Sequence, residues 1–90
     1  MKLYIYRGLE NEEVPKDVTH VIVDSSVTVI KSHAFCECIH LVSVIMGDNV
    51  KRIERYAFFR CTALRFIRLS KTLDYIGMYA YDSLEALFLH

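Results

Sequence analysis

The chain has 90 residues, the size of one small domain, and 53% of them are hydrophobic, so it is neither disordered nor low in complexity. Eleven basic and eleven acidic residues give a formal net charge of zero, which argues against nucleic acid or an anionic membrane as the partner, because both attract broadly basic surfaces. No apolar run approaches the roughly 18 residues of a membrane span, and the first residues do not show the apolar core of a secretory signal. Three cysteines is an odd number, so we expect free thiols and a cytoplasmic location.

Residues 1–17 are predicted to form a capping strand followed by a polar turn. Leu3 and Ile5 alternate with polar or amphipathic side chains, as expected in a strand. Pro15 lies in the polar stretch that follows and cannot donate a backbone hydrogen bond to a sheet, so it marks a loop. We expect this segment to cover one end of the hydrophobic core.

Residues 18–90 repeat with a period of 23 residues and no gap, in units 21–43, 44–66 and 67–89. Three sets of equivalent positions are identical: Ile30/Ile53/Ile76, Ala34/Ala57/Ala80 and Leu41/Leu64/Leu87. Four more keep their apolar character: Val21/Val44/Ile67, Val23/Met46/Leu69, Val27/Val50/Leu73 and Phe35/Phe58/Tyr81. Charged residues are absent from all of these sets, so the repeat is one of core positions.

A 23-residue unit is too short to bury its own apolar face, so the units are expected to stack as a solenoid around one shared core. The alternation of apolar residues, as in Val21 and Val23, predicts one strand in each coil. Stacked coils would then form a narrow parallel sheet. The alanine-aromatic pairs, such as Ala34-Phe35, are predicted to lie in short helical turns on the other side.

The spacing of the apolar positions also resembles a known family. An isoleucine is followed at fixed offsets by Ala-Phe, Cys and Leu, as in Ile30, Ala34-Phe35, Cys38 and Leu41. The second unit repeats this pattern, and the third has Leu84 in place of the cysteine. The pattern resembles the BspA-type leucine-rich repeats over residues 18–90. This resemblance implies an α/β, β-rich leucine-rich repeat solenoid of about three coils, in a family of interaction or surface-adhesion proteins.

The stretch from residue 33 to residue 41 carries four side chains that can ligate zinc: His33, Cys36, Cys38 and His40. The repeat gives them other roles, because Cys38 aligns with Cys61 in an apolar column and His33 aligns with a tyrosine in each of the other units. Structural zinc needs four converging ligands, which a C-x-C pair in one short turn does not offer. We therefore predict no metal site and no cofactor.

The cysteines could also have two other roles. Adjacent coils would bring Cys38 and Cys61 within bridging distance, so a disulfide stays open beside the reduced thiols that we expect. Cys36 with His33 or His40 could act as a nucleophile only with a cleft, an orienting third group and an oxyanion site. A short solenoid offers no obvious cleft, so we predict no catalytic residues and no enzyme.

The outward positions of the strands are the predicted partner-binding site. Five side chains are expected there: His20, Ile22, Ile45, Phe66 and Arg68. Apolar residues with a polar rim are typical of protein interfaces, and aromatic and arginine side chains often anchor them. The alternative is that β-branched residues occupy strands whichever way they face.

The predicted function is a non-enzymatic module for protein-protein interaction. The alternative is a structural or adhesive fragment of a longer repeat protein. The final "LFLH" starts a further strand without a polar cap, so self-association through this C-terminal edge is a second expectation.

Overall fold

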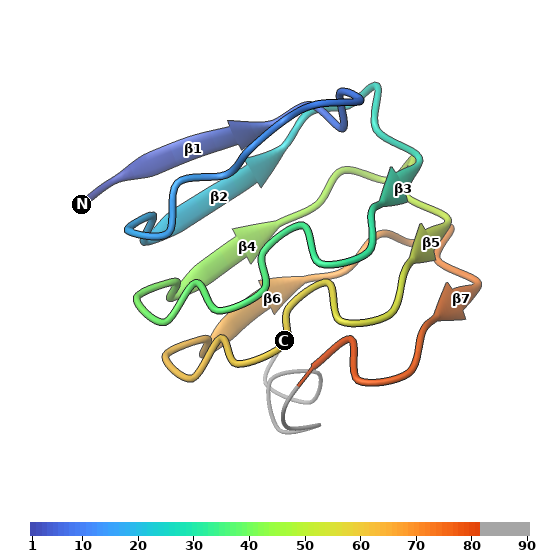
Figure 1. Cartoon of the computed structure of the whole chain (residues 1–90). Helices are drawn as coiled ribbons and strands as arrows, with labels where there is room; N and C mark the ends of the chain where they lie inside the picture. Colours follow the sequence, from blue (N-terminus) through green and yellow to red (C-terminus); the bar gives the residue numbers. More distant parts are fainter. Residues whose placement is uncertain (82–90) are drawn as a thin grey trace.

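The computed structural model describes residues 1–81, and their strands form two parallel sheets (Figure 1). The first sheet has the order β1-β2-β4-β6 and the second has the order β3-β5-β7. The strands are β1 Leu3–Tyr6, β2 His20–Val23, β3 Val29–Ile30, β4 Ser43–Ile45, β5 Arg52–Ile53, β6 Phe66–Arg68 and β7 Tyr75–Ile76. Leu84, Leu87 and the predicted final strand lie outside the described residues.

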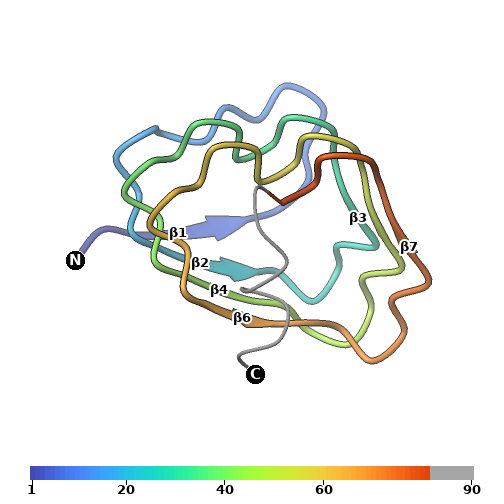
Figure 2. The same cartoon turned by 90° about the horizontal axis from the view of Figure 1, so that it is seen from below.

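The 23-residue period sets the register between coils. Ser43 of β4 pairs with His20 of β2 on one side and with Phe66 of β6 on the other, and all these pairings are parallel. Each coil therefore lies over the one before it, as the view along the stack shows (Figure 2). The predicted solenoid with a parallel sheet is confirmed. The sheet has one strand in each coil as predicted, but each repeat also adds a strand to the second sheet, which the sequence did not predict.

The core fills the space between the two sheets with the side chains of the repeat columns. Val21, Val44 and Ile67 are at most 1% exposed, because alternate residues of a strand point to the same side. The second sheet contributes the fully buried Ile30 and Ile53. Their equivalent Ile76, predicted as a core residue, is 42% exposed. That prediction was wrong, and Ile76 lies in β7, the last strand of its sheet in the described part of the chain.

A ladder of aromatic rings runs through this core. Phe35 and Phe58 are stacked with ring centroids 5.1 Å apart, and Tyr81 continues the stack at 5.0 Å from Phe58. Tyr6 of β1 completes it at the N-terminal end, with its ring tilted 5.0 Å from Phe35. We call these four side chains the buried ladder. Its spacing follows from the distance of about 4.8 Å between adjacent strands.

The N-terminal strand β1 joins the first sheet at its edge. Leu3 pairs with His20, so the offset here is 17 residues rather than 23. The loop after β1 is held by the carboxylate of Glu12, which accepts hydrogen bonds from the Tyr4 hydroxyl at 2.6 Å and the Leu9 N–H at 2.9 Å. The division of the chain into a cap of residues 1–17 and a solenoid of residues 18–90 stays a prediction.

The alanine-aromatic turns are not helical, which corrects the predicted short helical turns. The backbone N–H of Phe35 donates to the carbonyl of Ala57 at 2.7 Å, and that of Phe58 donates to Ala80 at 2.8 Å. In a helix these groups would bond within their own segment. Here they bond to the next coil, so the turns extend the ladder of backbone hydrogen bonds around the solenoid.

Left-handed residues bend the backbone at equivalent places in successive turns. His33, Tyr56 and Tyr79 have φ angles of 63°, 60° and 55°, and Glu37 and Arg60 both have 62°. Such a φ interrupts a right-handed helix and is unfavourable for side chains other than glycine. The hydrogen bonds between coils offset this local cost, which is why a helix does not form.

Candidate protein-binding face

The five predicted binding residues lie on the outward side of β2, β4 and β6. His20, Ser43 and Phe66 form one row, and Ile22, Ile45 and Arg68 form the next. The exposed fractions are 40% for Ile22, 39% for Ile45 and 48% for Phe66, so this side of the sheet presents apolar side chains to solvent. We call this surface, with β1 included, the binding face.

The first strand extends both rows, which the sequence analysis missed. Leu3 pairs with His20 and is 49% exposed, while Ile5 pairs with Ile22 and is half-buried. The repeat could not reveal this continuation, because the offset between β1 and β2 differs from the period of the repeat. The alternation in β1 was the available signal, and it showed a strand without showing its register.

Arg68 is held in a defined position at one end of the binding face. Its guanidinium donates a hydrogen bond to the carbonyl of Met46 at 2.7 Å and lies 3.9 Å from the carboxylate of Asp48. At the other side of the face, the Nδ1 atom of His20 lies 2.8 Å from the Thr19 hydroxyl. Both polar groups are thus oriented by neighbouring groups of the chain itself.

The four candidate zinc ligands are not brought together. His33 is exposed and its ring stacks on Tyr56, with centroids 5.0 Å apart, whereas Cys38 is fully buried in the core. Cys36 is half-buried and His40 is exposed. Within residues 1–81, no group of three or more His, Cys, Asp or Glu side chains is placed to hold a metal ion.

Cys36, Cys38 and Cys61 are free thiols in the structure. The Cys61 thiol donates a hydrogen bond to the carbonyl of Phe35 at 3.0 Å, which satisfies it inside the core. Burial raises the pKa of Cys38, so this thiol is a weaker nucleophile than an exposed one. Cys38 and Cys61 therefore act as small apolar side chains of the core.

A family model described as "BspA type Leucine rich repeat region (6 copies)" matches residues 14–88. Neither characterised proteins nor solved structures gave a match. None of the described residues forms a helix long and apolar enough to cross a membrane. Repeats of this family are generally non-enzymatic and often serve in protein interaction or adhesion. Because the match extends over most of the sequence and the coils stack in the register that the repeat requires, the chain belongs to the BspA-type leucine-rich repeat family.

Proposed function

We propose that this chain is a non-enzymatic module that binds a protein partner through the binding face. The observation that carries the proposal is the set of exposed apolar side chains on neighbouring strands, namely Leu3, Ile22, Ile45 and Phe66. Ile22 and Ile45 are paired in the sheet, and Leu3 and Phe66 lie diagonally from them in the row that also holds His20 and Ser43, so the four form an apolar strip with polar side chains beside it. Contiguous apolar surface with a polar border is characteristic of interaction sites.

Strand preference alone does not account for this strip. Isoleucine favours strands on either side of a sheet, which explains Ile22 and Ile45 without any function. Leu3 is not among the residues that favour strands, and Phe66, the first residue of β6, is a large apolar residue that is 48% exposed. Aromatic side chains of this kind are frequent anchors in protein interfaces.

The charge on the binding face indicates what the partner should present. Arg65 and Arg68 flank Phe66, and Arg68 already lies against the sheet through its bond to the Met46 carbonyl. A partner with an apolar ridge and a carboxylate beside it would complement this surface. The carboxylate would meet a guanidinium that is already ordered.

The test compares proteins captured by the chain and by variants, with quantitative mass spectrometry. Phe66→Ala combined with Ile45→Ser should reduce capture of the specific partner about tenfold or more, since interface anchors each contribute about 1–2 kcal/mol or more. The control is Tyr79→Ala, which removes an exposed ring outside the binding face and should leave capture unchanged. Equal capture by all three proteins would contradict the proposal.

A structural or adhesive role within a longer repeat protein is the second candidate. The constant register of β2, β4 and β6 favours it, because each coil offers the next one the same row of backbone groups. Self-association through the C-terminal edge is part of this candidate. Sedimentation of the chain at increasing concentration tests it: a mass that stays at one copy speaks against self-association.

A further inference from the structure

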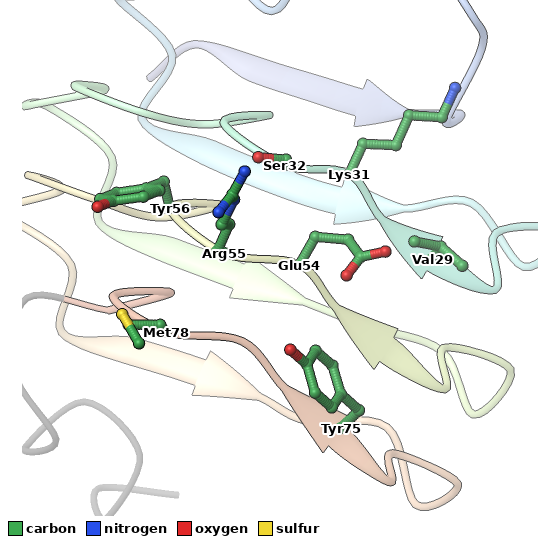
Figure 3. Close-up of a pocket in the computed structure, with 8 residues that line it drawn as sticks. All are labelled: Val29, Lys31, Ser32, Glu54, Arg55, Tyr56, Tyr75 and Met78. Atoms are coloured by element: carbon green, nitrogen blue, oxygen red, sulfur yellow. The ribbon is translucent and has the colours of Figure 1, made fainter.

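A second surface feature lies on the outer side of the sheet β3-β5-β7, away from the binding face. It is an open cleft of about 600 Å³ that crosses three coils, and Figure 3 shows the side chains around it. Lys31 and Ser32 lie at one end, Glu54, Arg55 and Tyr56 in the middle coil, and Tyr75 and Met78 at the other end. The proposal that follows goes beyond the function proposed above and does not depend on it.

Two cations line the cleft, Lys31 in the first coil and Arg55 in the middle coil. In the part of the chain that the structure describes, the side chains of Lys31 and Arg55 have no ion pair and no hydrogen bond. Glu54 is the one carboxylate among the described lining residues, and it lies 3.5 Å from the guanidinium of Arg52. Because Arg52 offsets Glu54, Lys31 and Arg55 supply the positive charge of the cleft itself, while Glu10, Glu12 and Glu13 line the space on the other side of Lys31.

The other end of the cleft is apolar and aromatic. Tyr75 is 43% exposed and supports the guanidinium of Arg52, which lies 4.1 Å from its ring centroid. Tyr56 is stacked between His33 and Tyr79, at centroid distances of 5.0 and 5.5 Å, so it forms a fixed wall. Met78 is 69% exposed, and its flexible thioether can adapt to the shape of a bound side chain.

Gly77 sets how closely the last two coils approach each other at this end of the cleft. The 23-residue period aligns it with Lys31 and Glu54, which line the cleft. A Cβ atom at position 77 would come within 2.5 Å of the backbone N of Arg55, so the two coils approach each other closely only with glycine there. The N–H of Gly77 donates to the carbonyl of Ile53 at 2.7 Å and fixes this approach.

We propose that this cleft binds an extended acidic peptide of a partner protein. One carboxylate of the peptide would pair with Arg55 and a neighbouring one with Lys31, whose side chain points away from Arg55 (Figure 3), and an apolar side chain would pack against Tyr75 and Met78. Three coils at a spacing of about 4.8 Å place the two ends of the cleft about 10 Å apart, which is about three residues of extended chain. The acidic and the apolar residue of the peptide are therefore two or three positions apart. A nucleic acid fits less well, because Glu54 lines the cleft and a phosphate backbone requires many cations in a row.

The experiment is an NMR titration of the whole chain with a capped peptide of sequence Gly-Glu-Glu-Gly-Leu-Phe-Gly. We expect backbone amide shifts to concentrate in residues 29–32, 54–56 and 75–78. The matched peptide with glutamine in place of both glutamates should bind about tenfold more weakly, because it lacks both charge-assisted contacts. Binding of the acidic peptide should also weaken as the salt concentration rises.

Two double variants separate the cleft from the rest of the surface. Lys31→Gln with Arg55→Gln should weaken binding of the acidic peptide about tenfold, whereas Lys51→Gln with Lys71→Gln, which removes two exposed lysines outside the cleft, should leave it unchanged. The proposal would be overturned by equal binding of the two peptides or by equal effects of the two double variants. It would also be overturned by tighter binding of a single-stranded oligonucleotide, or by amide shifts concentrated in β2, β4 and β6. Phe66→Ala with Ile45→Ser should not affect peptide binding, so failure of this site and failure of the binding face are distinguishable.

Discussion

Two stacks of aromatic rings run along this solenoid with nearly the same spacing and very different surroundings. The buried ladder keeps its rings 5.0 to 5.1 Å apart within the core. The exposed stack of His33, Tyr56 and Tyr79 has spacings of 5.0 and 5.5 Å at the surface. The spacing is therefore set by the stacking of coils, and it says nothing about stability. The difference lies in burial: Tyr6, Phe35 and Phe58 are at most 3% exposed, whereas His33 and Tyr79 are exposed to water.

The two stacks also differ in backbone conformation. Each residue of the exposed stack has a left-handed backbone conformation, with φ between 55° and 63°. The members of the buried ladder are not among the residues with positive φ. One stack thus stabilises the fold through its side chains, while the other occupies a position whose backbone is unfavourable for any residue but glycine.

The largest effect is expected when a ring is removed from the buried ladder. Phe58→Ala leaves a cavity between Phe35 and Tyr81 and should lower the free energy of unfolding by about 3–5 kcal/mol. Urea denaturation followed by circular dichroism measures this loss. Phe59→Ala is the matched control, because Phe59 is next in sequence and only half-buried. Similar losses in both variants would contradict the distinction between buried and exposed rings.

The second prediction concerns the loop above Tyr6, where the buried ladder begins. Partial burial alone would raise the pKa of Glu12. Hydrogen bonds from the Tyr4 hydroxyl and from backbone N–H groups, among them that of Leu9, nevertheless lower this pKa below its ordinary value of 4.5. A carboxyl group of this kind stabilises the fold above its ordinary pKa, and the stabilisation is lost as the pH falls through the lowered pKa. Glu12→Gln should therefore cost about 2 kcal/mol at neutral pH.

Denaturation at several pH values checks the sign of this effect. The difference in stability between the chain and Glu12→Gln should shrink as the pH falls below about 4. The partner of Glu12 gives an independent check at high pH, because burial and the bond to Glu12 raise the pKa of Tyr4 to about 12. Stability from Tyr4 should be complete below pH 10 and decline between pH 10 and about 12. The decline should be smaller in Tyr4→Phe, where the raised pKa values of Tyr6 and Tyr81 still contribute. A constant difference between the chain and Glu12→Gln at all pH values would be the contrary result.

The third prediction concerns the last ring of the buried ladder. The Tyr81 hydroxyl is buried, burial raises its pKa strongly, and it has no hydrogen-bond partner in the described structure. The equivalent residues Phe35 and Phe58 lack this hydroxyl. Tyr81→Phe should therefore raise the free energy of unfolding by about 1 kcal/mol, measured by urea denaturation. Lower stability in this variant would show that the hydroxyl has a partner.

The smallest effect is expected in the exposed stack. Tyr56→Ala loses three ring contacts, with His33, Phe59 and Tyr79, and should lower stability by about 1 kcal/mol. Tyr56→Gly loses the same contacts but relieves the left-handed backbone at φ 60°, so its stability should stay within about 0.5 kcal/mol of the unchanged chain. Thermal unfolding of the two variants tests this order of stability. An alanine variant as stable as the glycine variant would show that the backbone at this position is not strained.

The binding face was largely predictable from sequence, and the cleft was not. A strict period with inward Val21, Val44 and Ile67 leaves one arrangement of outward residues, so the rows through His20 and Ile22 follow from counting. The cleft depends on how closely Gly77 approaches the backbone of Arg55 and on which cations lack partners. Neither property has a signature in a single sequence.

The N-terminal coil also contains a core side chain that the repeat pattern could not predict. Position 12 is where the period would place the next ring of the buried ladder, yet it holds Glu12, and the ring is supplied by Tyr6 from β1. Tyr6 is fixed there because Tyr6 pairs with Val23 and its hydroxyl accepts a hydrogen bond from the Lys31 N–H at 3.2 Å. The repeat pattern could not indicate a replacement that comes from a different part of the coil.

The stacking of coils, the register of β2, β4 and β6, and most of the core could be derived from the amino-acid sequence, because all three follow from apolar residues spaced at a constant 23 positions. The second sheet, the left-handed turns at His33 and Tyr56, and the place of β1 became known only from the folded chain. These features depend on which backbone groups of neighbouring coils meet and form hydrogen bonds. Such pairing depends on contacts between segments, so it cannot be predicted from the residues of one segment alone.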